Sequence, residues 1–497
     1  MDTPILALIA VAAYLGLLLF LGQRTGRKAS MSDFSLGGRR SPWWAVAFGM
    51  IGTSLSGVTF LSVPGWVGTQ QFGYMQMVLG YVVGYAVITT VLLPLYYRLQ
   101  LTSIYEYLGQ RIGTRSYKTG AAFFLLSRSM GAAFRLYLVV LVLNETVLPE
   151  ASGAAEWIRL TVLIAAVLGI IWAYTRRGGI ATVVWTDTLQ TACMLLAAAV
   201  AVVLIGRELD LSILDLPRAI ADSGHARWWF FEDWGAANHG VKQFIAGAFI
   251  SLCMTGLDQD MMQKNLSCRN LRDAQLNVTS FSVVLVFVNL LFLSLGALLL
   301  MHTDATGTVV ERADLLFATV ALKSSMGWAL PILFLLGLVA AALSSADSAL
   351  TALTTSVCVD FLGMDKAGDA GQADAVRRRQ RIHLLVSMGV GLLILGFHAV
   401  NDTSVIAALF KVTGYTYGPL LGLFAFCLFR KDRPDAGTDQ WIPWVAVAAP
   451  CCGYALEQWT SSQGFSFGFA LLPVNGFLTW LGATFAASLS ARTTAKA

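Results

Sequence analysis

Hydroxyl and carboxylate side chains interrupt one of the most apolar stretches of this sequence. Residues 330–339 are almost wholly apolar, and polar side chains then crowd into residues 344–355. At 100° per residue, one helical face and its flanks carry Ser344, Ser345, Asp347, Ser348, Thr351 and Thr355. Hard oxygen donors of this kind suit a hard cation such as Na⁺. The alternative interpretation is that small side chains only allow close helix packing.

Asp347 is the most demanding member of this group. An ionised aspartate near the centre of a bilayer costs roughly 3 kcal/mol on insertion scales, so such residues are usually paired or coordinate something. We therefore expect other helices to hold partners against this face.

The whole chain has the composition of a membrane protein with many spans. It has 497 residues, of which 56% are hydrophobic and 13% charged, with a mean hydropathy of +0.66; soluble domains carry about 25% charged residues. The seven cysteines and five histidines show no spacing typical of disulfides or transition metals. No phosphate-binding loop or nucleophile motif follows a predicted strand, so we expect neither ATP-driven transport nor an enzyme.

The sequence predicts an all-α fold with about thirteen transmembrane helices. The apolar segments are 4–22, 43–66, 72–97, 117–147, 157–175, 178–206, 241–262, 275–301, 327–358, 382–399, 404–428, 441–457 and 468–489. If the N-terminus lies outside, the inner connections hold 24 of the 34 Lys and Arg residues, Lys264 among them. The positive-inside rule therefore predicts an outer N-terminus and an inner C-terminus.

Two of these segments contain sequence interruptions. Residues 52–60 read GTSLSGVTF, and residues 255–260 read TGLDQD. The two segments lie five segments apart, so they occupy equivalent places in two consecutive five-segment blocks. Paired broken helices of this kind indicate inverted repeats with a binding site near the midplane of the membrane. Each break leaves backbone groups free to bind ions or substrate.

The chain resembles the sodium/solute symporter family, which includes bacterial carriers of sialic acid, galactose and proline. The resemblance covers roughly residues 30–430 and rests on residues 33–40 (DFSLGGRR), 54–60 (SLSGVTF), 101–108 (LTSIYEYL), 185–190 (WTDTLQ) and 341–345 (AALSS). It implies a LeuT-type core of two inverted five-helix repeats in one transport domain, residues 1–497. Its parts are an extra helix and inner loop (1–42), repeat 1 (43–206), an outer loop (207–240), repeat 2 (241–428), and two extra helices with a tail (429–497).

The resemblance also implies ion sites. The family's common sodium site maps onto Gly52, Leu55, Ala341, Ser344 and Ser345. A second sodium site, similar to that of sialic acid carriers, maps onto Asp187, Ser344 and Ser348. Asp347 stands where those relatives have a serine. Asp187 and Asp347 are therefore expected to bind a second Na⁺ strongly or to share a proton.

The substrate pocket is expected between the second, fourth, seventh and eleventh apolar segments. Its candidate residues are Ser56, Thr59, Arg135, Asp258, Gln259, Asp260, Lys411, Thr413 and Tyr415. The substrate-binding arginine of sialic acid carriers aligns with Gly131 here, one turn from Arg135. Arg135 and Lys411 are expected either to clamp a substrate carboxylate or to neutralise the aspartates. Asp260 and Gln259 are equally suited to the hydroxyls of a neutral solute.

Together these features predict a multi-pass protein of the bacterial inner membrane. Its expected function is Na⁺-coupled symport of a small polar solute, either an anionic carboxylate resembling sialic acid or a sugar, by alternating access. Proton coupling through Asp187 or Asp347 is the first alternative, and a polytopic membrane sensor is an alternative of another class. The expected partners are a small-molecule substrate, sodium ions and the lipid bilayer, without nucleic acid, and the oligomeric state is unknown.

Overall fold

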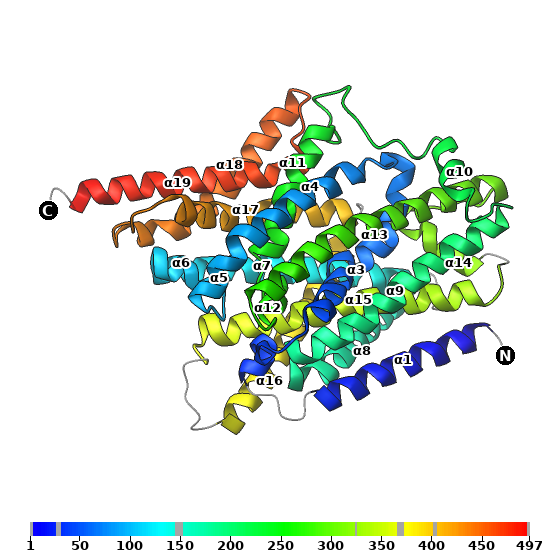
Figure 1. Cartoon of the computed structure of the whole chain (residues 1–497), viewed down its shortest axis with the longest axis horizontal. Helices are drawn as coiled ribbons and strands as arrows, with labels where there is room; N and C mark the ends of the chain where they lie inside the picture. Colours follow the sequence, from blue (N-terminus) through cyan, green and yellow to red (C-terminus); the bar gives the residue numbers. More distant parts are fainter. Residues whose placement is uncertain are drawn as a thin grey trace.

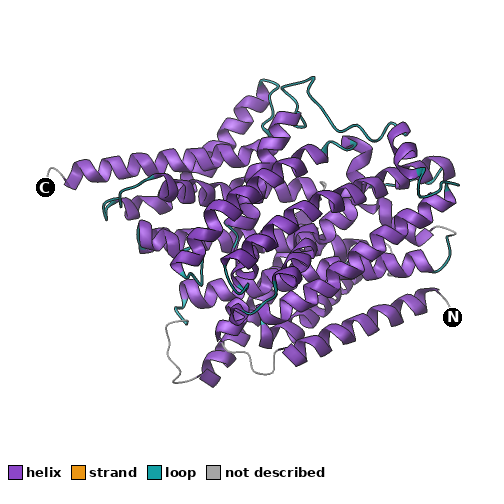
Figure 2. Cartoon of the chain, viewed as in Figure 1, coloured by secondary structure: helices purple, strands orange, loops and turns teal. Residues whose placement is uncertain are grey.

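A computed structural model describes residues 3–25, 31–144, 153–323, 326–364, 372–400 and 405–494. Within these ranges helices make up nearly all of the regular structure and loops connect them, as Figure 2 shows. Their β structure is limited to an isolated bridge between Ser41 and Cys268. Some of the basic residues counted for the orientation, including Arg27, Lys28 and Lys366, lie outside the described residues.

The helices follow the predicted apolar segments. They are α1 (Thr3–Thr25), α2 (Met31–Leu36), η1 (Gly37–Arg39), α3 (Trp43–Gln70), α4 (Tyr74–Val87), η2 (Ile88–Leu92), α5 (Leu93–Leu99), α6 (Glu106–Arg111), α7 (Thr114–Val142), α8 (Ala154–Gly178), α9 (Ile180–Glu208), α10 (Leu216–Asp222), α11 (Gly240–Ser251), η4 (Leu252–Gly256), α12 (Gln259–Leu266), α13 (Leu271–Thr306), η5 (Ala313–Leu315), α14 (Leu316–Lys323), α15 (Ala329–Ser356), η6 (Val357–Phe361), α16 (Gln372–Val400), α17 (Val405–Phe429), α18 (Thr438–Ser462), η7 (Gly468–Ala470) and α19 (Leu471–Thr494).

Ten of the described helical spans are long and apolar enough to cross a membrane, and a bent pair makes an eleventh. The bent pair is residues 240–256 with α12, which meet at 63°. Helices α1 and α18 cover the other two predicted segments but do not pass the same test of length and hydropathy. The count of thirteen transmembrane helices therefore stays a prediction.

Both predicted helix breaks are present. In α3 the break lies at Ser56, whose φ of 31° and ψ of 175° are not helical. The Ser56 hydroxyl accepts a hydrogen bond from the Val58 amide at 3.3 Å, as an N-cap does, and so starts the second half of the helix. In the other span, Asp258 has an extended backbone and caps α12 with its side chain. Gly- and Ser-rich sequence thus breaks one span, and an aspartate cap restarts the other.

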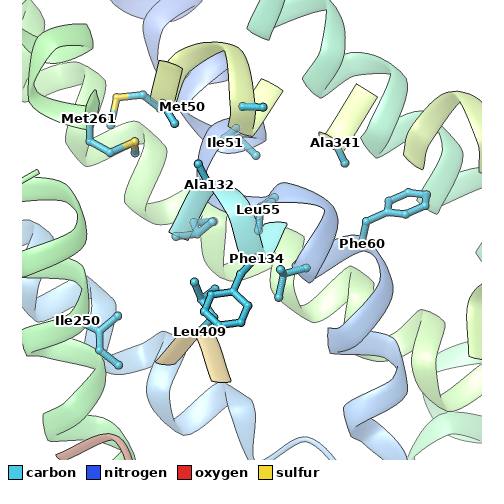
Figure 3. Packing of buried hydrophobic residues seen from close by; sticks show 14 of the residues in the cluster. Met50, Ile51, Leu55, Phe60, Ala132, Phe134, Ile250, Met261, Ala341 and Leu409 are labelled. Carbon is cyan, nitrogen blue, oxygen red and sulfur yellow. The ribbon is translucent and has the colours of Figure 1, made fainter. Parts of the chain in front are cut away.

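Helix α3 lies at the centre of the bundle, where it packs against α9, α13 and α15. Figure 1 shows α1 along one side of the molecule and α19 along the opposite side. Figure 3 shows that α3, α7, α11, α12, α15 and α17 all contribute side chains to the hydrophobic core around Leu55. The polar stretch of α15 is fully buried, from Ser344 to Thr351. Packing therefore places both helix breaks and this stretch in the interior.

Candidate functional site

One turn before its break, α3 packs closely against the polar face of α15 at Gly52. A Cβ atom at this position would lie 2.3 Å from Thr191 Oγ1 and 3.0 Å from Ser344 Oγ. Only glycine leaves this space open, and the Gly52 amide donates a hydrogen bond to Thr191 Oγ1 at 3.0 Å. Ser344 Oγ is buried, and no described residue is its hydrogen-bond partner. A buried hydroxyl without a partner is costly, so this oxygen suits a ligand.

The other predicted sodium ligands lie on the same two helices, α3 and α15. Leu55 is the last residue before the break, and the final carbonyl groups of a helix have no intrahelical partner. The Ser345 hydroxyl donates to the Ala341 carbonyl at 3.2 Å, within α15. Carbonyl and hydroxyl oxygens of this kind fit a hard cation such as Na⁺. In the described part of the chain, no cluster of three His, Cys, Asp or Glu side chains offers a transition-metal site.

A cavity of about 80 Å³ adjoins the same break. This is several times the roughly 10–15 Å³ that one water molecule requires. Its polar lining includes Ser54, Ser56, Thr59, Tyr74, Tyr81, Tyr85, Arg128, Arg135 and Asn289. Three predicted substrate residues, Ser56, Thr59 and Arg135, thus lie on one cavity.

Arg135 is a buried cation on the wall of this cavity. The residue is 6% exposed, and one of its guanidinium nitrogens lies 3.5 Å from the Thr53 carbonyl oxygen. No carboxylate among the described residues forms an ion pair with it, and its Nε atom has no hydrogen-bond partner there. A buried guanidinium without a counterion is costly, so an anion in the cavity would stabilise it.

Arg128, one heptad earlier on α7, has its charge satisfied within the protein. Its guanidinium forms an ion pair with Asp260 and lies 3.9 Å from Asp258 Oδ2. The Ser348 hydroxyl also donates to Asp260, and the Tyr417 hydroxyl donates to Asp258. Arg128, and not Arg135 or Lys411, is therefore the ion-pair partner of the two aspartates in the structure.

The remaining predicted substrate residues lie away from the cavity. Gln259 binds the connection before α6, where it donates to the Thr102 carbonyl at 2.8 Å and accepts from the Ile104 amide at 3.0 Å. Lys411 is exposed and lines a different pocket with Glu457. The two further residues of α17 are also engaged elsewhere: the Thr413 hydroxyl donates to the Leu409 carbonyl, and the Tyr415 hydroxyl to Glu457.

The residues of the expected second sodium site have different partners. Asp187 Oδ2 accepts from Lys264 Nζ at 2.5 Å, and both side chains are 1% exposed. Asp347 Oδ2 accepts from the Tyr174 hydroxyl at 2.7 Å and from the Thr186 hydroxyl at 3.4 Å. Ser348 is bound to Asp260. Asp187 and Asp347 thus enter two separate hydrogen-bond networks.

Sequence reasoning missed the partners in these networks, above all Lys264, Tyr174 and Tyr417. The positive-inside rule assigns Lys264 to a basic inner connection, but the structure buries it in the last turn of α12. A partial signal is its spacing, because Lys264 lies four residues after Asp260 and therefore on the same helical face, but this spacing does not identify Asp187 as its partner. That inner connection keeps Arg269 and Arg272, so it is still basic without Lys264.

Comparisons with known proteins agree with this architecture. The chain is 26% identical to the sodium/sialic acid symporter NanT of Aliivibrio fischeri, over 85% of this chain and 83% of the relative. It is 25% identical to the human sodium-coupled monocarboxylate transporter 1, over 91% of this chain and 71% of the relative. A solved outward-open, substrate-bound structure of a Na⁺-coupled sialic acid symporter superposes with a TM-score of 0.81, at 20% identity, covering 98% of both chains. The profile of the sodium:solute symporter family matches residues 34–437, and the chain therefore belongs to that family.

Proposed function

We propose that this protein imports a small organic carboxylate together with Na⁺. The observation that carries the substrate class is the buried charge of Arg135 on the cavity wall. A planar guanidinium recognises a carboxylate through two parallel hydrogen bonds. The cavity volume of about 80 Å³ favours a compact solute. The names of two relatives, a sialic acid symporter and a monocarboxylate transporter, support the same class.

Na⁺ is the coupling ion of the family, and the sites through which it acts here are part of the proposal. Its ligands are the backbone carbonyls of Gly52, Leu55 and Ala341 with the hydroxyls of Ser344 and Ser345. The support is the open space at Gly52 beside a buried hydroxyl that lacks a partner among the described residues. Because these atoms span α3 and α15, bound Na⁺ would hold the two helices together and shape the adjoining cavity.

The finer points of topology also belong to this proposal. Thirteen helices cross a bacterial inner membrane, with the N-terminus outside and the C-terminus inside. Ten of them form two inverted repeats, 43–206 and 241–428, whose broken helices α3 and α11–α12 meet near the midplane. The relative motion of these repeats opens the cavity to either side of the membrane in turn. The basic inner connections and the two observed breaks support this arrangement.

Solute-stimulated uptake of ²²Na⁺ into proteoliposomes tests the function and requires no radiolabelled substrate. Pyruvate, sialic acid, galactose and proline would each be supplied with an inward Na⁺ gradient. We expect the carboxylate pyruvate to stimulate ²²Na⁺ uptake and the neutral sugar not to do so. Arg135→Gln should abolish the stimulation, whereas Lys411→Gln, at an exposed position outside the cavity, should preserve it. Equal stimulation by galactose, unchanged in Arg135→Gln, would reject the carboxylate assignment.

A further inference from the structure

Lys264 brings a positive charge into the region where the sequence predicts a second sodium ion. Its Nζ atom lies 2.5 Å from Asp187 Oδ2 and also donates a hydrogen bond to Thr53 Oγ1. The Thr53 hydroxyl in turn donates to Asp187 Oδ2 at 3.1 Å. The ammonium group, the hydroxyl and the carboxylate therefore form a closed triangle in the protein interior.

Three separate helices supply this triangle. Thr53 lies on α3 just before the break, Asp187 lies on α9, and Lys264 lies in the last turn of α12. Helices α3 and α9 approach each other closely here: a Cβ atom on Gly49 would lie only 3.0 Å from the Cβ atom of Asp187. Lys264 therefore extends from α12, the second half of a broken span, and its side chain reaches the carboxylate of Asp187 on α9, beside Thr53 on α3.

We propose that the Lys264 ammonium takes the place of a second sodium ion, so that the protein binds and carries a single Na⁺ in each cycle. This inference rests on the proposed function and specifies its ion stoichiometry. An ammonium group is a compact, strongly hydrated point charge, so it satisfies a carboxylate and a hydroxyl much as an alkali cation does. Unlike Na⁺, it is covalently tethered to α12 and cannot leave on either side of the membrane.

The balance of buried charges agrees with a single mobile cation. Asp187 and Asp347 are both fully buried, and Lys264 supplies one positive charge against these two negative ones. The hydroxyls of Tyr174 and Thr186 donate to Asp347, so its Oδ2 atom is satisfied by neutral groups and not by a second cation. Ser344 lies one helical turn before Asp347 on α15. With both carboxylates ionised, one Na⁺ bound at Ser344 would balance Asp187, Asp347 and Lys264, whereas two would leave these three groups and their ions with a net positive charge.

Equilibrium binding of ²²Na⁺ to the purified protein in detergent tests the proposal, because it requires no substrate. We expect the unmodified protein to bind one Na⁺ per chain and Lys264→Ala to bind two. In that variant Asp187 loses its counterion, and the shortened side chain leaves room for a sodium ion. The double variant Lys264→Met with Asp187→Asn removes both charges and should again bind one. Lys242→Gln is a matched control, because Lys242 is buried among the carbonyls of Gly235, Ala236 and Ser466, away from this site.

The possible results separate this inference from the proposed function. The absence of saturable ²²Na⁺ binding in the unmodified protein would contradict Na⁺ coupling itself. Two bound ions in the unmodified protein would overturn the role of Lys264 while leaving Na⁺ symport intact. One bound ion in both the unmodified protein and a folded Lys264→Ala variant would also overturn it. Removing the lysine would then have opened no second Na⁺ site. If Lys264→Ala does not fold, the count in the unmodified protein still tests the proposal, because two bound ions there would overturn it.

Discussion

Arg128 and Arg135 lie seven residues apart on α7, and both are buried on the same cavity. We predict opposite outcomes when each is replaced by methionine, which has a similar length and no charge. Arg128→Met should strongly destabilise the protein, because it leaves Asp258 and Asp260 buried without a counterion. Arg135→Met should leave stability unchanged or raise it, because that guanidinium has no ion-pair partner among the described residues.

The size of the Arg128 effect follows from its geometry. At the 3.9 Å between Arg128 and Asp258, an effective dielectric constant of about 20 gives roughly 4 kcal/mol for this pair. Removing one partner of a buried ion pair costs about 3–5 kcal/mol in measured cases, which agrees with this figure. The closer contact with Asp260 adds to the loss. By contrast, the Arg135 contact to a carbonyl at 3.5 Å is at the limit of a hydrogen bond.

Thermal unfolding in detergent, followed by tryptophan fluorescence, compares the two variants at equal protein concentration. The melting temperature should fall by several degrees for Arg128→Met and should not fall for Arg135→Met. Adding Asp260→Asn to Arg128→Met should recover part of the loss, because it removes one of the unpaired carboxylates. An equal or larger drop for Arg135→Met, or no rescue by Asp260→Asn, would refute this assignment of charges.

Three further predictions concern the ion site and its surroundings. Gly52→Ala should abolish saturable ²²Na⁺ binding, because its Cβ would lie 2.3 Å from Thr191 Oγ1; Gly169→Ala, which meets nothing within 4 Å, is the control. Ser344→Ala should raise the Na⁺ concentration for half-maximal binding roughly ten- to a hundredfold, as expected from losing an interaction of about 1.5–3 kcal/mol with a charged group. Ser387→Ala, whose hydroxyl bonds within its own helix at 2.8 Å, should not change it. Tyr174→Phe removes the 2.7 Å donor to Asp347 and should lower the melting temperature, whereas Tyr454→Phe, at a site 51% exposed, should not; no shift in Tyr174→Phe would contradict the role of this hydrogen bond.

The sequence is sufficient to predict features that depend on local pattern. Apolar length predicts the positions of the helices, and glycine and serine between apolar residues predict a break within residues 52–60, which the structure has at Ser56. The hydroxyl pattern of α15 indicates a buried polar face, and the structure buries all of it. These features depend on residues close together in the chain, so helical periodicity is enough to find them.

The pairing of charges could not be predicted in this way. Arg128 and Arg135 are two turns apart on one face of α7, and periodicity alone does not indicate which of them meets Asp260. Lys264 follows the break before α12, and its burial depends on the 63° bend of that span. A charged residue near the end of an apolar segment is normally assigned to the aqueous side. Here Lys264 follows the bend and lies in the core.

If Arg135 binds the substrate, as proposed, its position on α7 bears on the shape of that substrate. The resemblance described above predicts that the substrate-binding arginine of sialic acid carriers aligns with Gly131, and here Arg135 lies one turn further along α7. The structure leaves space at Gly131, since a Cβ there would meet only Leu409 Cδ1, at 3.9 Å. One helical turn is about 5.4 Å, which exceeds the tolerance of a bidentate contact between a guanidinium and a carboxylate. If Arg135 binds a carboxylate, that group therefore sits about one turn from its position in a sialic acid carrier. We then expect the rest of the substrate to differ in length or shape from sialic acid.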